Sequence, residues 1–303
     1  MPATARAIVM RHTGGPEVLA VEEVSLAPLA PGEVRLRALA SAVNHSDLQV
    51  RAGNWPIRRN PRFPYVPGLE VVGVVVEVSG DVRAFAVGDR AWTTMQGLGG
   101  VRAERDGGYA EYVTIAADAL AALPADIDAV AFAAIGLAGV TAIEAMRRLG
   151  PLRGKTLAVS GATGGVGAVA VGIGRAIGAN VIALNRGSPA PPPATIDAVL
   201  DGVAGSLFPT LVAALRPHGH YCMVGAAAGS DVAFDLWTLL DGRSLTGYSS
   251  EDLDGDALRT ATRELLALSL PQPPTTVVPL VEAARAHALL ESRAVPGRVV
   301  LVP

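Results

Sequence analysis

Apolar and β-branched residues gather in short stretches in the first part of the chain, and Gly, Pro and Asp separate these stretches. Such runs bounded by turn residues are typical of strands. Because short strands separated by turns fold readily into closed sheets, we expect a compact barrel-like domain here. The predicted strands are Arg6 to Val9, Val34 to Ala40, Val71 to Val78, Ala91 to Thr94 and Tyr109 to Ile115.

The pattern changes from residue 129 onward. Residues Ala129 to Leu149 favour a helix, which Gly150 and Pro151 end. Short apolar runs then alternate with helical patterns, and this order is typical of a doubly wound parallel sheet. The runs are Leu157 to Ser160, the stretch that begins at Val181, Asp197 to Leu200 and Tyr221 to Val224.

The last residues return to the first pattern. Thr276 to Pro303 reads as a strand, an amphipathic helix at Val281 to Glu291 and a further strand, which we expect to rejoin the first domain. The predicted class is therefore α/β with two domains. Residues 1–124 and 272–303 form the β-rich domain, and residues 125–271 form the parallel-sheet domain.

Composition narrows the function to small-molecule chemistry. With 303 residues, 50% hydrophobic and 17% charged, the chain is long enough for two well-packed domains. A net charge of -3 without a basic run disfavours nucleic acid and acidic membranes as partners. The single Cys222 excludes an internal disulfide framework, and the start lacks the pattern of a secretion signal. No uninterrupted apolar run reaches the length of a membrane span, so we expect a cytoplasmic protein that acts on a small-molecule substrate.

The most informative stretch is the glycine turn after the first parallel strand. The apolar run Leu157 to Ser160 leads directly into Gly161 to Gly167, which opens a helix of small residues. The N-H groups at the start of such a helix bind phosphate, so this outline predicts a dinucleotide site. Arg186 follows about 20 residues after the turn, where the ribose is recognised. An Arg at that place, where an acidic residue is common, favours NADPH.

A segment that such a sheet normally contains is missing after Arg186. The chain runs through Gly187 to Thr195, which is rich in Pro, straight into Ile196 to Asp201. In the usual strand order 3-2-1-4-5-6 the third strand is an edge, so its loss leaves the sheet intact and strand two exposed. Eight or nine extended residues reach roughly 25 to 30 Å, enough to pass from the top of strand two to the bottom of strand four. We therefore read this stretch as a strap whose prolines discourage pairing at the new edge.

Several stretches, in order along most of the chain, resemble one family. They are Ala42 to Asp47, Val66 to Gly73, Val87 to Arg90, Gly107 to Val113, Gly161 to Gly167 and Leu290 to Ala294. The chain resembles a zinc-independent medium-chain dehydrogenase/reductase of the quinone oxidoreductase, or zeta-crystallin-like, type. The resemblance implies a GroES-like catalytic domain plus a Rossmann domain, here lacking its third strand. It also implies that substrate and nicotinamide meet in a cleft between the domains and that the protein is a homodimer.

The glycine turn and the resemblance together predict the residues that hold the cofactor. Gly164 to Gly167 would bind the pyrophosphate, with Ala162 beside them. Asn185 and Arg186 would hold the adenosine 2'-phosphate nearly alone, because relatives use further residues from the missing segment. Gly225 and Ala226 would border the ribose. In full, the predicted set is Ala162, Gly164, Gly165, Val166, Gly167, Asn185, Arg186, Gly225 and Ala226.

No metal is expected. The zinc-using relatives have Cys where this chain has Asn44 and His where it has Leu69, and one Cys cannot build a structural zinc lobe. His218, His220 and Cys222 alternate and could share a strand face, but Pro217 to Gly219 reads as a turn into a buried strand. Without a Lewis acid, hydrogen bonds alone must polarise a carbonyl, which suits conjugate reduction of an activated C=C.

The candidate catalytic residues are Asn44, Thr141 and Tyr65, each with a structural alternative. The resemblance places Asn44 beside the nicotinamide, and the structural alternative is an Asx turn that caps the next helix, with Asp47 as a rival cap. Thr141 matches a family threonine near the cofactor or bonds to its own helix. Tyr65 falls in the loop that covers the substrate pocket in relatives, or packs as an ordinary aromatic.

The proton donor is not evident. Gln49 stands where relatives often carry a Tyr that is proposed to donate a proton, so Gln49 lines the pocket at most, together with Trp55. Water, Tyr65 or His45 would have to supply the proton, and His45 beside a helix start is more simply a surface or capping residue.

Three functions remain open. The leading one is NADPH-dependent reduction of a quinone or of the C=C of an α,β-unsaturated carbonyl. The second is a non-redox cyclase, lyase or isomerase of a biosynthetic pathway, which the missing segment and Gln49 favour and the intact glycine turn opposes. The third is a protein that senses NADPH.

Overall fold

The computed structural model describes residues 1–55, 62–98 and 105–303, which form two compact units. Unit 1 comprises residues 1–137, 251–262 and 272–303, and unit 2 comprises residues 138–250 and 263–271. The predicted domain boundaries differ from these divisions. The division falls within a helix, between Leu137 and Ala138, and residues 251–262 group with unit 1.

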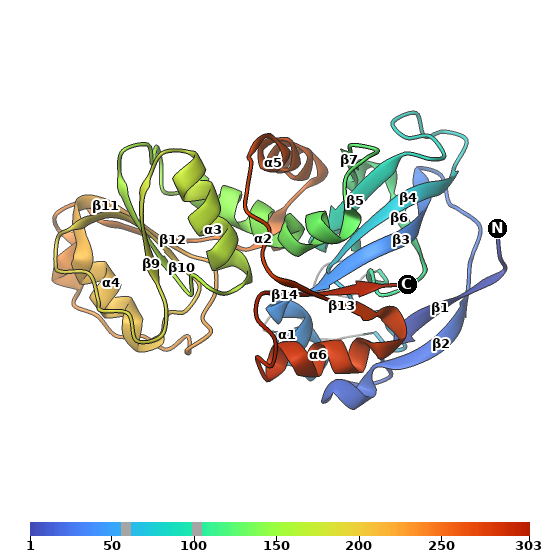
Figure 1. The fold of residues 1–303 in the computed structure, drawn as a ribbon, viewed down its shortest axis with the longest axis horizontal. Helices are drawn as coiled ribbons and strands as arrows, with labels where there is room; N and C mark the ends of the chain where they lie inside the picture. Colours follow the sequence, from blue (N-terminus) through green and yellow to red (C-terminus); the bar gives the residue numbers. More distant parts are fainter. Residues whose placement is uncertain (56–61, 99–104) are drawn as a thin grey trace. The chain divides into compact units, whose positions relative to one another are not determined.

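Unit 1 is built on a seven-stranded sheet with the order β13-β14-β3-β4-β5-β7, on which β6 pairs with β3 (Figure 1). Its long antiparallel pair joins β3 to β4, and a separate two-stranded ribbon joins β1 to β2. The bounds are β1 Thr4–Val9, β2 Ala20–Ser25, β3 Glu33–Val43, β4 Glu70–Val78, β5 Arg90–Thr94, β6 Tyr112–Ala116, β7 Ala121–Leu123, β13 Thr275–Pro279 and β14 Arg298–Val302.

The apolar positions of these strands form the core of unit 1. Val34, Leu36, Val71 and Val75 are fully buried, and they belong to one hydrophobic cluster. Helices α1 (His45–Ala52) and α6 (Ala283–Glu291) complete the unit. The predicted strand at Tyr109 to Ile115 is partly wrong, because Ala110 forms only an isolated bridge to Ala7 and the strand begins at Tyr112.

Unit 2 is built on a five-stranded parallel sheet with the order β12-β11-β10-β8-β9 (Figure 1). This order confirms a Rossmann-like sheet without its third strand, since β9 is the edge. The sheet's strands are β8 Thr156–Ser160, β9 Asn180–Leu184, β10 Ile196–Asp201, β11 Leu215–Met223 and β12 Ser244–Gly247. The helices are α3 Gly165–Ala176 and α4 Phe208–Ala214.

The strap between β9 and β10 is well defined. It begins with a turn in which Ser188 N donates to Asn185 O at 3.0 Å. Pro191 is buried, and the amides of Ala194 and Thr195 donate to the carbonyls of Ala213 and Ala214. The strap therefore packs against the end of α4 before the chain enters β10.

Strand β11 is longer than predicted. Residues Pro217 to Gly219 lie within it rather than before it, and the pairing with β10 shifts register between Ile196 and Ala198. His218 absorbs the irregularity with a φ of 62°. The bulge explains why a turn signature occurs inside a strand.

Two long helices contain residues of both units. They are α2 (Ala129–Arg147) and α5 (Gly255–Ala267). Among the described residues, Ala129–Arg148 is the one helical stretch long and apolar enough to cross a membrane, and 78% of its most apolar window is buried inside the structure. Its apolar character is that of a core helix.

Candidate functional site

The glycine turn of unit 2 presents free backbone amides at the start of α3. The turn closes by a hydrogen bond from Gly164 N to Gly161 O at 2.8 Å, and Gly164 is the extended N-cap residue. The first intrahelical bond of α3 comes from Ala168 N to Gly164 O. The amides of Gly165, Val166 and Gly167 therefore have no carbonyl acceptor within the helix and are available to an anion.

Two glycines of the turn have steric reasons to be glycine. Gly161 has a φ of +60°, which side chains rarely adopt. A Cβ on Gly167 would overlap the carbonyl oxygen of Gly161, so α3 approaches the end of β8 as closely as a backbone allows. Ala162 is buried and donates its amide to Leu184 O at 3.2 Å, whereas Gly164 is exposed. The turn is thus a rigid backbone surface open to a phosphate.

Asn185 and Arg186 lie directly after β9 at the same edge. Both are exposed, and Ser188 Oγ accepts a hydrogen bond from Asn185 N at 2.9 Å. Arg186 forms no ion pair with any residue in the described ranges. Its guanidinium is therefore available to an anion, and its role with a phosphate stays a prediction.

The remaining predicted residues of unit 2 lie on its loops and on α2. Gly225 and Ala226 follow β11 and are half-buried. Thr141 is buried, and its hydroxyl pairs with Ser250 Oγ at 2.9 Å. The cofactor roles of these residues stay predictions.

Asn44, in unit 1, has its side-chain amide engaged by the protein. Its Nδ2 donates to Glu70 Oε1 at 2.7 Å and to Ala42 O at 3.3 Å, and its Oδ1 accepts from Arg298 Nη2 at 2.7 Å. Glu70 and Arg298 thereby fix both the position and the orientation of the amide. A substrate oxygen can gain a hydrogen bond from Asn44 only in place of the long bond to Ala42.

Asn44 also begins α1, so the structural alternative holds as well. It is the N-cap residue, with φ -106° and ψ 159°, and its N-H donates to Asp47 Oδ2 at 2.8 Å. Asp47 Oδ1 accepts from Leu69 N at 3.0 Å. Asp47 thus caps the helix in return and ties it to the segment that leads into β4.

Two buried carboxyls lie beside Asn44. Burial raises the pKa of Asp47 to about 7, although the Asn44 N-H bond opposes this shift. Burial likewise raises the pKa of Glu70 to about 6, while the charge of Arg298 and the Asn44 bond lower it. Glu70 Oε2 also accepts from Leu137 N at 3.0 Å, and the Arg298–Glu70 ion pair measures 3.9 Å. Neither carboxyl is held firmly in its charged form near neutral pH.

A chain of polar side chains extends from Asp47 towards α6. Tyr109 lies beside His287, with Oη and Nε2 3.3 Å apart, and Arg51 lies 3.4 Å from His287 Nδ1. Burial, and then the charge of Arg51, lower the pKa of His287 to about 3. The imidazole is therefore neutral, and Arg51 also donates to Glu291 Oε1 at 3.1 Å. We interpret this series of contacting side chains as structural.

The residues around Asn44 do not fit a catalytic zinc ion. Leu69 and Leu137 offer no side-chain ligand, and the amide of Asn44 is already engaged. Arg298 places a fixed positive charge beside Glu70, where a metal would need its ligand. Within the described ranges no three His, Cys, Asp or Glu residues gather as a metal site would require.

The other predicted pocket residues lie in different surroundings. Tyr65 is buried in the core of unit 1, and its backbone pairs with Met10. Trp55 is half-buried and donates Nε1-H to Glu251 Oε1 at 2.7 Å. Gln49 Nε2 lies 3.3 Å from Nε2 of the exposed His45, one turn earlier in α1. Tyr65 is thus a packing residue first, and its catalytic role stays a prediction.

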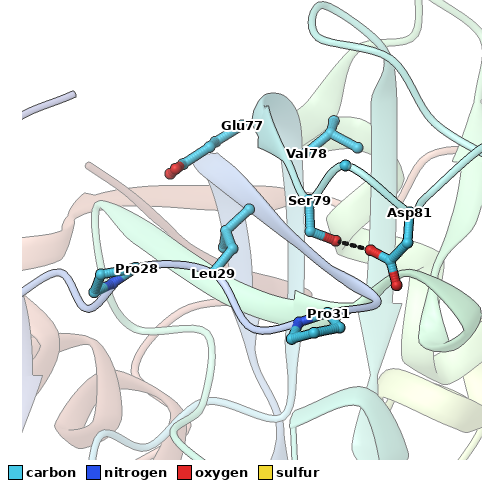
Figure 2. Close-up of a pocket in the computed structure, with 8 residues that line it drawn as sticks. Pro28, Leu29, Pro31, Glu77, Val78, Ser79 and Asp81 are labelled. Carbon is cyan, nitrogen blue, oxygen red and sulfur yellow. Dashed lines mark hydrogen bonds between the residues drawn. The ribbon is translucent and has the colours of Figure 1, made fainter.

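A surface hollow of about 550 Å³ lies elsewhere in unit 1 (Figure 2). It surrounds the end of β4, where Ser79 Oγ donates to Asp81 Oδ1 at 2.6 Å. Glu70 begins that strand, so eight residue steps of about 3.3 Å separate the two ends by roughly 26 Å. The hollow is therefore not part of the Asn44 cluster. It is lined by Pro28, Leu29, Pro31, Glu77, Val78, Ser79, Gly80 and Asp81.

Sequence reasoning missed Glu70 and Arg298. Glu70 lies inside a stretch that carries the family resemblance, and its apolar neighbours signal a buried acid. Arg298 lies some 250 residues away from Asn44 and has no local motif, so only the pairing of β14 with β3 reveals the contact.

Two family matches cover separate parts of the chain. Residues 30–125 match the alcohol dehydrogenase GroES-like domain, and residues 177–301 match a family described as zinc-binding dehydrogenase. The first match falls within unit 1, and the second starts in unit 2 and reaches the last strand.

Three known proteins illustrate the similarity. An alcohol dehydrogenase of Geobacillus stearothermophilus is 37% identical over 190 residues, which span 56% of this chain and 55% of that protein. A quinone oxidoreductase of Lama guanicoe is 38% identical over 173 residues, 56% of this chain and 49% of that protein. The chain thus matches about half the length of these curated relatives. A mycobacterial protein solved in complex with NADPH is 28% identical, with a TM-score of 0.82 over 98% of this chain and 100% of that chain.

Proposed function

We propose that the chain is an NADPH-dependent reductase of the medium-chain dehydrogenase/reductase family, of its quinone oxidoreductase type, as the two family matches and the similarity to a quinone oxidoreductase support. The proposed substrates are quinones and the C=C bond of α,β-unsaturated carbonyl compounds, and the reaction uses no zinc. The glycine turn of unit 2, with its three free amides and the exposed Arg186 beyond β9, is the observation that carries this proposal.

The proposed nucleotide binding depends mainly on the backbone of unit 2. The amides of Gly165 to Gly167 would hold the pyrophosphate, with Ala162 packed behind them. Arg186 would pair with the 2'-phosphate, which NADH lacks, and Asn185 lies beside it. The NADPH complex of a related protein supports the choice of cofactor.

In the proposed reaction, hydrogen bonds orient and polarise the substrate instead of a metal ion. When bound, NADPH would supply a hydride to the substrate, at the β-carbon if the substrate is an enone, and the proton that completes the reduction would come from water. Asn44 orients the substrate oxygen through the amide hydrogen that otherwise points to Ala42 O, while Arg298 keeps the amide from turning over. Asn44 and Leu69, in place of metal ligands, leave carbonyl polarisation to such donors.

The direct test is the oxidation of NADPH, followed by absorbance, with simple quinones and enones as acceptors. The expected result is turnover that a zinc chelator leaves unchanged in a protein that metal analysis finds free of zinc. Bound zinc at one equivalent, or no turnover with any acceptor, would contradict the proposal.

Arg186→Ala tests the choice of cofactor. Losing a charge-assisted hydrogen bond of about 1.5 to 3 kcal/mol should raise the KM for NADPH roughly tenfold to a hundredfold and leave the KM for NADH unchanged. Arg216→Ala, on the exposed amino end of β11, is the matched control because it removes the same charge at the opposite edge. An equal effect of Arg186→Ala on both cofactors would remove Arg186 from 2'-phosphate recognition.

The missing third strand favours a second candidate, a cyclase, lyase or isomerase that uses the same fold without hydride transfer. A sensor of NADPH is a third. Calorimetric titration with NADPH separates them, because only the reductase and the sensor require binding. Product analysis after incubation with an acceptor then separates the reductase from the sensor.

A further inference from the structure

A buried carboxylate joins two strands at the centre of the parallel sheet. Asp201 ends β10, the middle strand, and is fully buried. Ser160 ends the neighbouring strand β8, and its hydroxyl donates to Asp201 Oδ1. The chain leaves β8 for β9 on one side and returns to β10 on the other, so this pair spans the topological switch point. Ligands of open α/β sheets bind outside the strand ends at that point.

Four neutral groups donate to Asp201. Besides Ser160, the amides of Val203 and Ala204 bond to Oδ1 at 2.7 and 3.1 Å, and the hydroxyl of Tyr221 bonds to Oδ2. Burial, and next the charge of Asp201, raise the pKa of Tyr221, so its phenol keeps the donated proton. Ser160 Oγ accepts in turn from Gly202 N at 3.0 Å. The carboxylate is thus enclosed by donors from three strand ends.

The loop that Asp201 holds has an unusual backbone. Ala204 has a φ of 52° and is buried, and the next residue, Gly205, has a φ of 55°. An alanine persists in this conformation only where its surroundings hold it there, and such residues concentrate at ligand-binding loops. The two amide bonds to Asp201 provide that hold.

The same loop contacts both neighbouring loops of this edge. A Cβ on Gly161 would lie 3.1 Å from Val203 Cγ2, so Val203 rests on the glycine turn. On the other side, Ala227 N and Ala228 N donate to Gly202 O and Val203 O at 3.3 and 2.8 Å. Movement of the loop would therefore displace both the pyrophosphate turn and the residues that follow β11.

From these contacts we infer that Asp201 is the positioning residue of the dinucleotide site. It fixes the glycine turn, the Gly202–Gly205 loop and the loop after β11 in one arrangement, although it is itself buried and touches no ligand. The inference rests on the proposed function, because the ligand assigned to this edge is NADPH.

Asp201→Asn tests the inference. The variant keeps the size and one acceptor oxygen but loses the charge and turns an NH2 group towards Tyr221. Calorimetry should show a Kd for NADPH raised about tenfold or more, with the KM raised equally and kcat at saturating NADPH nearly unchanged. Amide hydrogen exchange at Val203 and Ala204 should become faster, whereas the circular dichroism spectrum stays that of the wild type.

Asp197→Asn is the matched control. Asp197 lies on the same strand at its amino end, where Oδ2 accepts from Thr156 N at 2.7 Å and from Arg216 Nη1 at 3.0 Å. It ties strands together just as Asp201 does, but at the edge opposite the nucleotide. Its substitution should leave the Kd for NADPH at the wild-type value.

Ser160→Ala is a second variant that tests the same inference if Asp201→Asn does not fold. It removes only the bridge across the switch point, and it should raise the Kd for NADPH by about threefold or more. If the wild type binds NADPH and the folded variants at Asp201 and Ser160 bind equally well, the inference is overturned and the proposed function stands. A loss in Asp197→Asn equal to that in Asp201→Asn also overturns the inference. If the wild type binds no NADPH, both fail.

Discussion

At the scale of single residues, the side-chain amide of Asn44 is fixed by two charged groups. Arg298 and Glu70 hold the two ends of the Asn44 amide at 2.7 Å each. A buried carboxyl beside a buried guanidinium is stable only while both are present. The orientation of Asn44 therefore depends on charges contributed by β4 and β14.

Arg298→Gln should expose this dependence through pH. Glu70 has a pKa of about 6 in the folded chain, above its usual 4.5. Between these two pH values the folded state binds more protons than the unfolded state, so the free energy of unfolding falls as the pH rises from 4.5 to about 6. Without Arg298 the ionised form loses its partner, so the loss of stability should be small at pH 5 and grow to about 3 kcal/mol at pH 8. Urea unfolding at several pH values measures this difference.

Arg6→Gln is the control for that experiment. Arg6 pairs with Glu111 at the surface, where its own side chain is 54% exposed, and such pairs contribute at most about 1 kcal/mol. A loss in Arg298→Gln that is the same at pH 5 and pH 8 would show that Glu70 does not depend on the guanidinium.

Residue roles were only partly predictable from the sequence. Asn44 could be found because the stretch around it resembles a family motif and follows a strand. Its partners could not, because Arg298 and Glu70 reach it only after β14 and β4 pair with β3. Long-range pairing leaves no local signal, and for the same reason the Thr141–Ser250 contact was missed.

At the scale of elements, the glycine turn and α3 form the most predictable part of the molecule. An apolar strand followed by spaced glycines and small helical residues fixes strand, turn and helix within a few residues, because each step has a steric cause. The strap was also predictable, since proline leaves few conformations. The longer β11 was not, because its bulge puts turn residues inside a strand.

Gly167→Ala should damage the turn while a neighbouring glycine of α3 tolerates the same change. The new methyl group would overlap Gly161 O, so we expect a loss of about 1 to 3 kcal/mol in the free energy of unfolding and no detectable NADPH binding. At Gly172 the added methyl would lie 3.4 Å from Leu270, an ordinary contact, and Gly172→Ala should stabilise the helix by up to about 1 kcal/mol. Thermal unfolding compares the two variants, and equal behaviour would contradict this account of the turn.

At the scale of the whole molecule, the fold class was predictable and the unit boundaries were not. Runs of short strands followed by alternating strands and helices define the two architectures. The boundary fell inside α2, however, because a continuous apolar helix gives no sequence signal where its surroundings change. The return of residues 251–262 to unit 1 has no signal for the same reason.

A homodimer remains the expected assembly. In unit 2, Leu236, Trp237 and Leu240 are 68%, 76% and 75% exposed, and β12 is a free edge of the sheet. Exposed apolar side chains and an open strand edge in the same unit each favour pairing with a second copy of the chain. Trp237→Glu should therefore give a folded monomer in sedimentation velocity, where the wild type sediments as a dimer. A monomeric wild type would refute this expectation.

Calorimetric titration of the wild type with NADPH and with NADH tests the central claim most directly. If the amides of the glycine turn and Arg186 still bind the nucleotide in a sheet without its third strand, NADPH should bind at one site per chain and more tightly than NADH. No heat with either nucleotide, from a protein that is folded by circular dichroism, would contradict the account.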